Sequence, residues 1–168
     1  QNRAFLHRVR TGRPWGTLKW AMGLDGRTAL SNGESQWISG PTARHWVHRL
    51  RSQSDAVIVG GGTVRADDPL LTSRGRRKPE PLRVVLSRSM ELPETAQLWD
   101  TSLAPTLVAH GPESQDQPFP PGPQRLLLSA SEPNPLMEEL ATRGCNRVLW
   151  ECGPELAAAA IRQGWIQE

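Results

Sequence analysis

The sequence predicts an α/β fold in which helices flank a mostly parallel central sheet. Short apolar runs that do not alternate with polar residues, such as DAVIVGG (55–61) and LRVVLS (82–87), are typical of strands buried on both faces. In the second half of the chain these runs alternate with helical patterns, which is the order that builds parallel sheets. A chain of 168 residues suits one domain with a real core, and no internal repeat or domain boundary interrupts it.

The first part of the chain predicts a strand, a loop, a helix and a second strand. The segment PWGTLKWAM (14–22) is rich in β-formers, and the next segment (23–37) contains the glycine, aspartate and asparagine residues that mark turns. Residues 39–53 predict a helix because apolar residues recur at helical spacing and Pro41 fits its first position. The strand DAVIVGG follows, and TVRAD after it could add a single helical turn.

The rest of the chain alternates strands with loops and helices. The loop GPESQDQPFPPGPQ is rich in proline and is expected to run over the surface. Gly144 closes one predicted helix, and Pro154 lies in the first turn of the next. In order, the expected elements are a loop at 74–81, strands at 82–87 and 105–110, the loop at 111–124, a strand at 125–129, a helix at 134–144, a strand at 146–151 and a helix at 153–164.

The charge of the chain comes mainly from arginine. The formal net charge is +3 and the pI is about 9.5, with Lys19 and Lys78 as the two lysines. Arginine suits bidentate binding of phosphate or carboxylate. The arginines are scattered rather than gathered into one stripe, so we do not expect a nucleic-acid-binding surface.

The cysteines and the apolar runs indicate the compartment. Cys145 and Cys152 form no CxxC pair, and no histidine lies at metal-ligand spacing, so we expect free thiols and no metal. No apolar run reaches the roughly 18 residues of a membrane span. We therefore expect a cytoplasmic protein without a membrane partner.

Two segments predict a ligand site at the carboxyl ends of the strands. Both AVIVGGGTV (56–64) and VLWECGPELAAAA (148–160) end a buried strand in glycine where a helix begins, a place that attracts phosphate. Two such ends indicate a ligand with two separated anionic groups, such as a dinucleotide. The alternative is that Gly60–Gly62 only form a tight turn, since GGGTVR has Arg65 where the G-x-G-x-x-G motif needs glycine.

Acidic residues lie next to both glycine segments. Glu151 ends an apolar strand, where a carboxylate is costly to bury without a partner, so a ligand contact is expected. Asp67 and Asp68 precede Pro69, and a capped turn is as good an explanation for them as a functional role.

Arginines and a serine suggest a phosphate site. Arg51 ends the first helix, Arg74 follows DDPLLTS, and Ser35 lies in the glycine-rich loop, where Trp37 could stack on a flat ring. No nucleophile–base constellation is evident, and the histidines of the first helix read as surface residues. Hydride transfer fits better than hydrolysis, because the cofactor carries that reaction.

Four segments of the chain resemble one enzyme family. TLKWAMGLDGRTAL, GESQWISGPTARHWVHRLRSQSDAVIVGGGTVRADDPLLTSR, PLRVVLSR and VLWECGPELAAAAI, in this order, are similar to the reductase domain of the bifunctional riboflavin-biosynthesis deaminase–reductase. The resemblance implies a dihydrofolate-reductase-like fold and a homodimer in the full-length chain. It implies NADPH-dependent reduction of 5-amino-6-(5-phosphoribosylamino)uracil to its ribitylamino product. Residues 1–12 are then expected to be a linker from an absent deaminase domain, and 13–168 a reductase domain incomplete at its C-terminal end.

The same resemblance assigns residues to roles. The implied proton donor is Asp67, Glu151 or a water. The implied substrate-binding residues, with the arginines and serine on the 5′-phosphate, are Ser35, Arg51, Leu71, Arg74 and Glu151. The implied cofactor-binding residues are Ala21, Trp37, Thr63, Asp67, Ser87, Gly153, Pro154, Glu155, Leu156, Ala157, Ala158 and Ala159.

Three other functions stay open at this point. One is a related reductase of the same fold acting on another pyrimidine or on dihydrofolate. The pair Arg51 and Arg74 argues against dihydrofolate, and only a turnover assay separates the two pyrimidines. Another is an inactive, truncated remnant that binds the cofactor. The third, nucleic-acid binding, rests on the pI alone.

Overall fold

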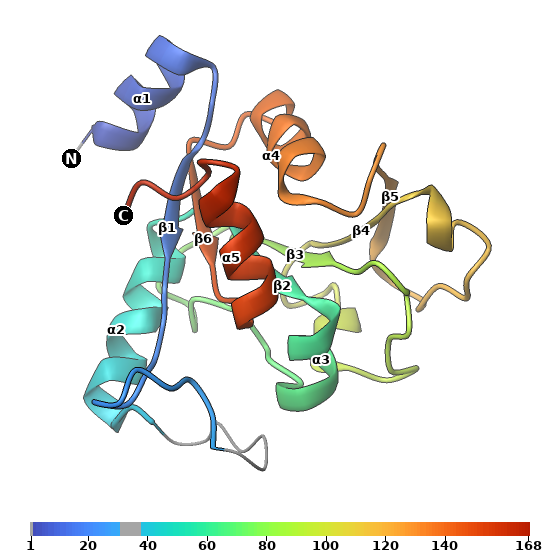
Figure 1. The fold of residues 1–168 in the computed structure, drawn as a ribbon, viewed down its shortest axis with the longest axis horizontal. Coiled ribbons are helices and arrows are strands. Elements are labelled where there is room, and N and C mark those ends of the chain that lie inside the picture. The colour runs from blue at the N-terminus through green and yellow to red at the C-terminus, as the bar shows by residue number, and fades with distance from the viewer. Residues whose placement is uncertain (1, 31–37) are drawn as a thin grey trace.

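The computed structural model describes residues 2–30 and 38–168 and is built on a parallel sheet (Figure 1). Six strands lie in the order β1-β6-β2-β3-β4-β5, and every neighbouring pair is parallel. The α/β class expected from the sequence is therefore confirmed. The strands are β1 (Trp15–Leu18), β2 (Ala56–Gly60), β3 (Leu82–Leu86), β4 (Thr106–His110), β5 (Gln124–Leu127) and β6 (Arg147–Trp150).

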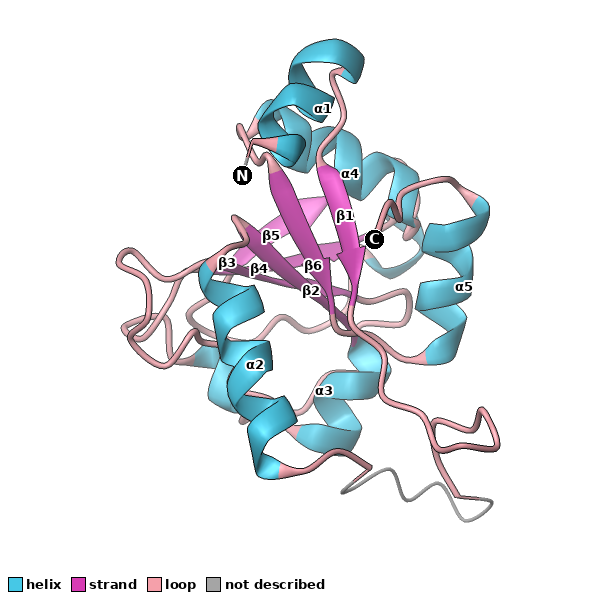
Figure 2. Ribbon diagram, turned by 90° about the vertical axis from the view of Figure 1, so that its left-hand side faces the viewer, coloured by secondary structure: helices cyan, strands magenta, loops and turns pink. Residues whose placement is uncertain are grey.

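Helices cover both faces of the sheet (Figure 2). On one face α4 and α5 pack on inward residues of the strands, and on the other α2 and α3 do so together with the segment around Leu98. None of the helices in the described part of the chain is long and apolar enough to cross a membrane. The helices are α1 (Arg3–Thr11), α2 (Pro41–Ser52), α3 (Gly61–Asp67), α4 (Pro133–Thr142) and α5 (Pro154–Arg162), with short 3-10 turns η1 (Gln97–Trp99) and η2 (Pro112–Ser114).

Strand β2 shows why continuous apolar runs predict central strands. Ala56 and Ile58 face the α4–α5 core, whereas Val57 and Val59 face the α2–α3 core. All four side chains are fully buried, so both faces of the strand must be apolar.

Helix α1 lies within residues 1–12, the segment that was expected to be a linker. Arg8 donates from Nη2 to the carbonyl of Ala141 at 3.0 Å, and Gly12 ends the helix in the left-handed conformation. Its large apolar side chains, including Phe5 and Val9, remain exposed. Phe5 and Val9 are four residues apart and lie on one face, and this spacing is the signal that could have found the helix.

The C-terminal residues lie along the outer edge of β1. The amide of Gln167 donates to the carbonyl of Gly16 at 2.9 Å, and the amide of Leu18 donates to the carbonyl of Glu168 at 2.8 Å. A Cβ atom on Gly16 would lie 1.8 Å from the carbonyl oxygen of Trp165, so this close approach requires glycine.

Candidate active site

The carboxyl ends of the parallel strands bring most of the described candidate residues to one edge of the sheet. Glu151 follows β6, Ser87 follows β3, and Thr63 lies on α3 directly after β2. Ala21 comes three residues after β1. In parallel sheets this edge is where ligands bind. Ser35 and Trp37 lie outside the described residues.

Two groups of residues make up this edge, and we name them for the roles the sequence suggests. The substrate half contains Arg51, Glu151 and the loop 68–74. The cofactor half contains Gly60–Thr63, Ser87 and residues 153–159.

An ion pair between Arg51 and Glu151 is the centre of the substrate half. Arg51 donates from Nε to Oε1 at 2.6 Å and from Nη2 to Oε2 at 2.9 Å, and from Nη1 to the carbonyl of Thr72 at 3.2 Å. The two side chains are only 13% and 8% exposed. The buried carboxylate thus has the partner that burial requires. Both of its oxygens accept from a guanidinium, which leaves Glu151 ill suited to donate a proton.

The loop after α3 holds an unusual backbone. Asp68, Leu71 and Arg74 all have φ between 38° and 57°, the left-handed region that residues other than glycine rarely adopt. Glu80 fixes the loop by accepting from the amides of Ser73 and Gly75 at 2.6 and 3.0 Å. Burial raises the pKa of Glu80, but these hydrogen bonds outweigh it and leave the pKa below its usual value.

The loop presents Arg74 and hides Leu71. Arg74 is exposed, whereas Leu71 as a whole residue is 1% exposed in the α2–α3 core. The expected substrate contact of Leu71 stays a prediction. The carboxylate of Asp68 accepts from the amide of Gln97 at 2.8 Å, as a capped turn predicts, while Asp67 is exposed at the end of α3.

The glycines of the cofactor half differ in how much space surrounds the position of a Cβ atom. A Cβ on Gly61 would lie 2.8 Å from Oγ of Ser87, so packing alone requires glycine there. A Cβ on Gly62 would meet one atom of Arg65 at 4.0 Å, and a Cβ on Gly153 would meet nothing within 4 Å. Open space over two backbone segments at the same edge is what a bulky anion needs, so these residues fit a dinucleotide.

The start of α5 offers backbone donors rather than side chains. Gly153 is its N-cap without a side-chain hydrogen bond, and Pro154 occupies the first helical position. Glu155 adds negative charge to the first turn, so a phosphate there would depend on amide groups. Leu156 packs on the α4–α5 core and Ala157 is buried, whereas Ala158 and Ala159 are half-buried.

His48 corrects the interpretation of the α2 histidines as surface residues. His45 is exposed, but His48 is half-buried. Its pKa is lowered by burial first, and then by the charges of Arg51, Arg74 and His45, while Glu151 raises it. Its spacing of three residues from Arg51, which places both on one helix face, was the signal that could have found it.

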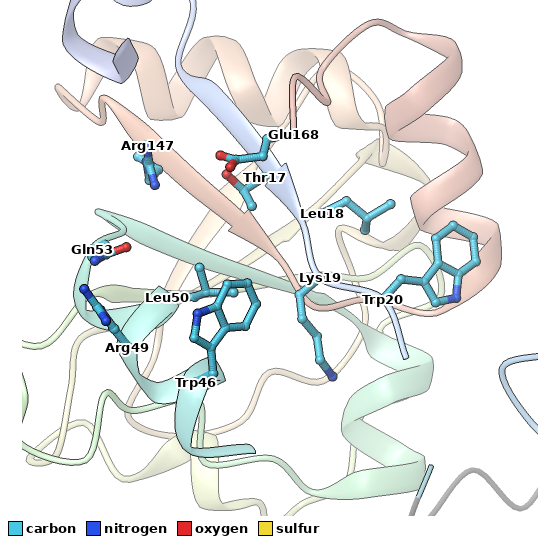
Figure 3. Close-up of a pocket in the computed structure, with 10 residues that line it drawn as sticks. All are labelled: Thr17, Leu18, Lys19, Trp20, Trp46, Arg49, Leu50, Gln53, Arg147 and Glu168. Atoms are coloured by element: carbon cyan, nitrogen blue, oxygen red, sulfur yellow. The ribbon is translucent and has the colours of Figure 1, made fainter. Parts of the chain in front are cut away.

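An open cleft of about 480 Å³ lies between β1 and α2 (Figure 3). Lys19, Trp20 and Trp46 line it, together with Glu168. None of the candidate site residues that the structure describes lines this cleft, although Ala21 lines a neighbouring hollow of about 320 Å³. The strand ends, and not this cleft, therefore define the candidate site.

Burial disfavours the reactive thiolate form of both cysteines. Cys145 and Cys152 are free, and burial raises their pKa values to about 11 and about 12. Both are therefore protonated at neutral pH. In the part of the chain that the structure describes, no group of acidic, histidine or cysteine side chains could hold a metal ion.

Comparison with known proteins identifies relatives of the whole chain. The chain is 48% identical over 171 residues to the riboflavin biosynthesis protein RibD of Synechocystis, covering 99% of this chain and 46% of that protein. It is 42% identical to the chloroplastic riboflavin biosynthesis protein PYRR of Arabidopsis thaliana, covering 99% of this chain and 28% of that protein. The chain thus spans less than half the length of these relatives.

A solved structure from Thermotoga maritima has the same fold. It is described as a diaminohydroxyphosphoribosylaminopyrimidine deaminase/5-amino-6-(5-phosphoribosylamino)uracil reductase. It matches with a TM-score of 0.84 and 30% identity over 95% of this chain and 45% of that chain. The dihydrofolate-reductase-like fold implied by the sequence is confirmed by this family. The family model described as the RibD C-terminal domain matches residues 14–168, and the chain belongs to that family.

Proposed function

We propose that this chain catalyses the NADPH-dependent reduction of 5-amino-6-(5-phosphoribosylamino)uracil to 5-amino-6-(5-phosphoribitylamino)uracil. The observation that carries the proposal is the meeting of two unlike groups at one sheet edge. Open backbone at Gly62 and Gly153 lies at the same strand ends as the Arg51–Glu151 pair. The first group suits a dinucleotide and the second a polar substrate. The printed name of the Thermotoga maritima relative includes this reductase activity.

The cofactor half would hold NADPH through its backbone. Amides at the start of α5, from Gly153 onward, would bind phosphate oxygens, and Thr63 would add a hydroxyl. Ser87 is buried, and its Oγ accepts from the amide of Met90 at 3.1 Å, so it would shape the floor of the site. When bound, NADPH supplies the hydride that reduces C1′ of the ring-opened ribosylamine.

The substrate half would orient the ribosylamine for hydride transfer. The reaction also needs a group that donates a proton to the nitrogen of the ribosylamine. Glu151, with both oxygens held by Arg51, would accept hydrogen bonds from substrate hydroxyl groups. The proton would then come from Asp67 or from a water. Arg74, exposed on its loop, would bind the phosphate.

The proposal includes the expected homodimer of the full-length chain and a cytoplasmic location. Two plant relatives are named as chloroplastic. Sedimentation of the full-length protein and cell fractionation test these two parts.

Binding and consumption of NADPH test the proposed function. NADPH should quench the tryptophan emission of the wild-type protein in a saturable way, and adding the substrate should cause NADPH to be oxidised. Gly153→Val should weaken NADPH binding, because a side chain there fills the space over the backbone. No saturable quenching, or no oxidation that depends on substrate, would reject the proposal.

Gly40→Val is the matched control for Gly153→Val. Gly40 is also a helix N-cap followed by proline, and its Cβ would likewise meet nothing within 4 Å. Its extended backbone, with φ −72° and ψ 173°, accepts valine as readily as that of Gly153. We expect this variant to bind NADPH as the wild type does.

A further inference from the structure

One face of helix α2 carries three basic side chains, one of which, Arg51, belongs to the substrate half. Arg44, His48 and Arg51 are spaced at i, i+4 and i+7, which places them on the same side of the helix. Arg44 donates from Nη1 to the carbonyl of Ser39 at 2.9 Å. Arg74, which comes from the loop after α3, adds a further charge that acts on His48.

His48 has an incomplete set of hydrogen bonds. Its Nδ1 is buried and has no hydrogen-bond partner among the described residues, which leaves Nε2 as the nitrogen that can reach a ligand. Burial, then the charges of Arg51, Arg74 and the neighbouring His45, lower its pKa below the ordinary 6.5, while the charge of Glu151 raises it. Burial and the nearby guanidinium groups therefore both favour the neutral imidazole in the free protein.

Most of the hydrogen-bonding capacity of Arg51 is already used within the protein. Its Nε and Nη2 are both bonded to Glu151, and its Nη1 donates to the carbonyl of Thr72 in the loop that carries Arg74. These bonds use three of the five N–H groups of the guanidinium, so one N–H on Nη1 and one on Nη2 remain for an anion. Arg51 thus holds Glu151 and the loop in place, and neighbouring side chains would complete the binding of an anion.

Resting on the proposed function, we propose that His48 is a phosphate-binding residue of the substrate site, where its Nε2 donates to the phosphoester of the substrate beside Arg74. A phosphate monoester carries a charge of about −1.5 to −2 at neutral pH. An anion this close favours the protonated imidazole and opposes the effect of the two arginines. Binding of the phosphate is therefore accompanied by uptake of a proton on His48.

An NMR titration of the four histidines tests the proton uptake directly. The probes are ribose 5-phosphate and sodium sulfate, because sulfate keeps its double charge throughout the titration, with sodium chloride at equal ionic strength as the control. His48→Gln identifies the resonance. We expect its midpoint to lie below 6.5 in the free protein and to rise with both probes but not with chloride. A midpoint that neither probe moves would overturn the proposal.

Kinetics of two matched variants separate phosphate binding from a structural role. His48→Gln should raise the KM for the phosphorylated substrate about tenfold, the loss expected for one charge-assisted hydrogen bond, and leave kcat and the KM for NADPH nearly unchanged. His45→Gln, at the exposed neighbouring histidine, should change none of these values. A wild-type KM in His48→Gln would refute the inference.

The two tests also separate this inference from the proposed function. If the wild-type protein consumes no NADPH with the substrate, the proposed function fails, and the NMR titration still reports whether His48 binds a phosphate. If turnover is normal but His48→Gln binds the substrate as well as the wild type does, the function stands and the inference fails.

Discussion

The substrate half of the candidate site is formed mainly by side chains, whereas the cofactor half is formed mainly by backbone. In the substrate half, Arg51 and Glu151 are side chains fixed by each other and shielded from water. In the cofactor half, Gly61 allows close packing against its neighbours, whereas Gly62 and Gly153 leave open space over the main chain. A side-chain site is broken by removing a partner, whereas a backbone site is broken by adding atoms. The predictions below use this contrast.

The largest effect on stability is expected from Arg51→Ala. It leaves the Glu151 carboxylate, with a side chain 8% exposed, without its partner, and an uncompensated buried charge costs about 3–5 kcal/mol. Urea denaturation measures the free energy of unfolding. The double variant Arg51→Met with Glu151→Met should recover most of the loss, since it removes both charges. A loss below about 1 kcal/mol in Arg51→Ala would show that the pair behaves as a surface ion pair.

A smaller effect, in the cofactor half, is expected from alanine at two adjacent glycines. Gly61→Ala should cost about 1–3 kcal/mol, because its Cβ would lie 2.8 Å from Oγ and 3.3 Å from Cβ of Ser87. Gly62→Ala should instead stabilise the protein by about 0.5–1 kcal/mol, since it lies in a helix with open space. Equal effects at both positions, measured by thermal unfolding, would contradict the distinction between a packing glycine and an open one.

The smallest effect is a pH dependence that comes from Glu80. Its folded-state pKa is lowered, so its contribution to stability is fully present above the ordinary value of 4.5 and is lost as the pH falls through the folded pKa. Glu80→Gln should therefore reduce the loss of stability below about pH 4.5 and leave the slope near neutral pH unchanged. Parallel stability curves for Glu80→Gln and wild type below that pH would mean that the amides of Ser73 and Gly75 do not depend on this carboxylate.

Short sequence patterns were enough to predict most of the strands and helices. The run at 55–61 predicts a strand buried on both faces, and β2 is such a strand because each face meets its own layer of helices. The order of the strands could not be read, since the place of β6 between β1 and β2 depends on contacts distant in sequence. Helix α1 was missed although its apolar side chains recur at helical spacing, and the sequence gives no sign that they stay exposed.

For the candidate site, the sequence likewise indicated the needs of single residues but not the contacts between residues distant in sequence. Glu151 was expected to need a partner and Arg51 was expected to bind an anion, but their mutual pairing across 100 residues is a property of the fold. Leu71 was expected to contact substrate, and nothing in the sequence indicates its positive φ or its burial. The ligand roles of Asp67, Thr63 and Ser87 remain predictions.

The central claim is that one sheet edge binds a dinucleotide through backbone and a phosphorylated substrate through side chains. Two-substrate steady-state kinetics of Gly153→Val and Arg74→Ala test this claim most directly. We predict a crossed result, in which Gly153→Val raises the KM for NADPH alone and Arg74→Ala raises the KM for the substrate alone. If both variants raise the same KM, or if the wild-type protein oxidises no NADPH with the substrate, the account is wrong.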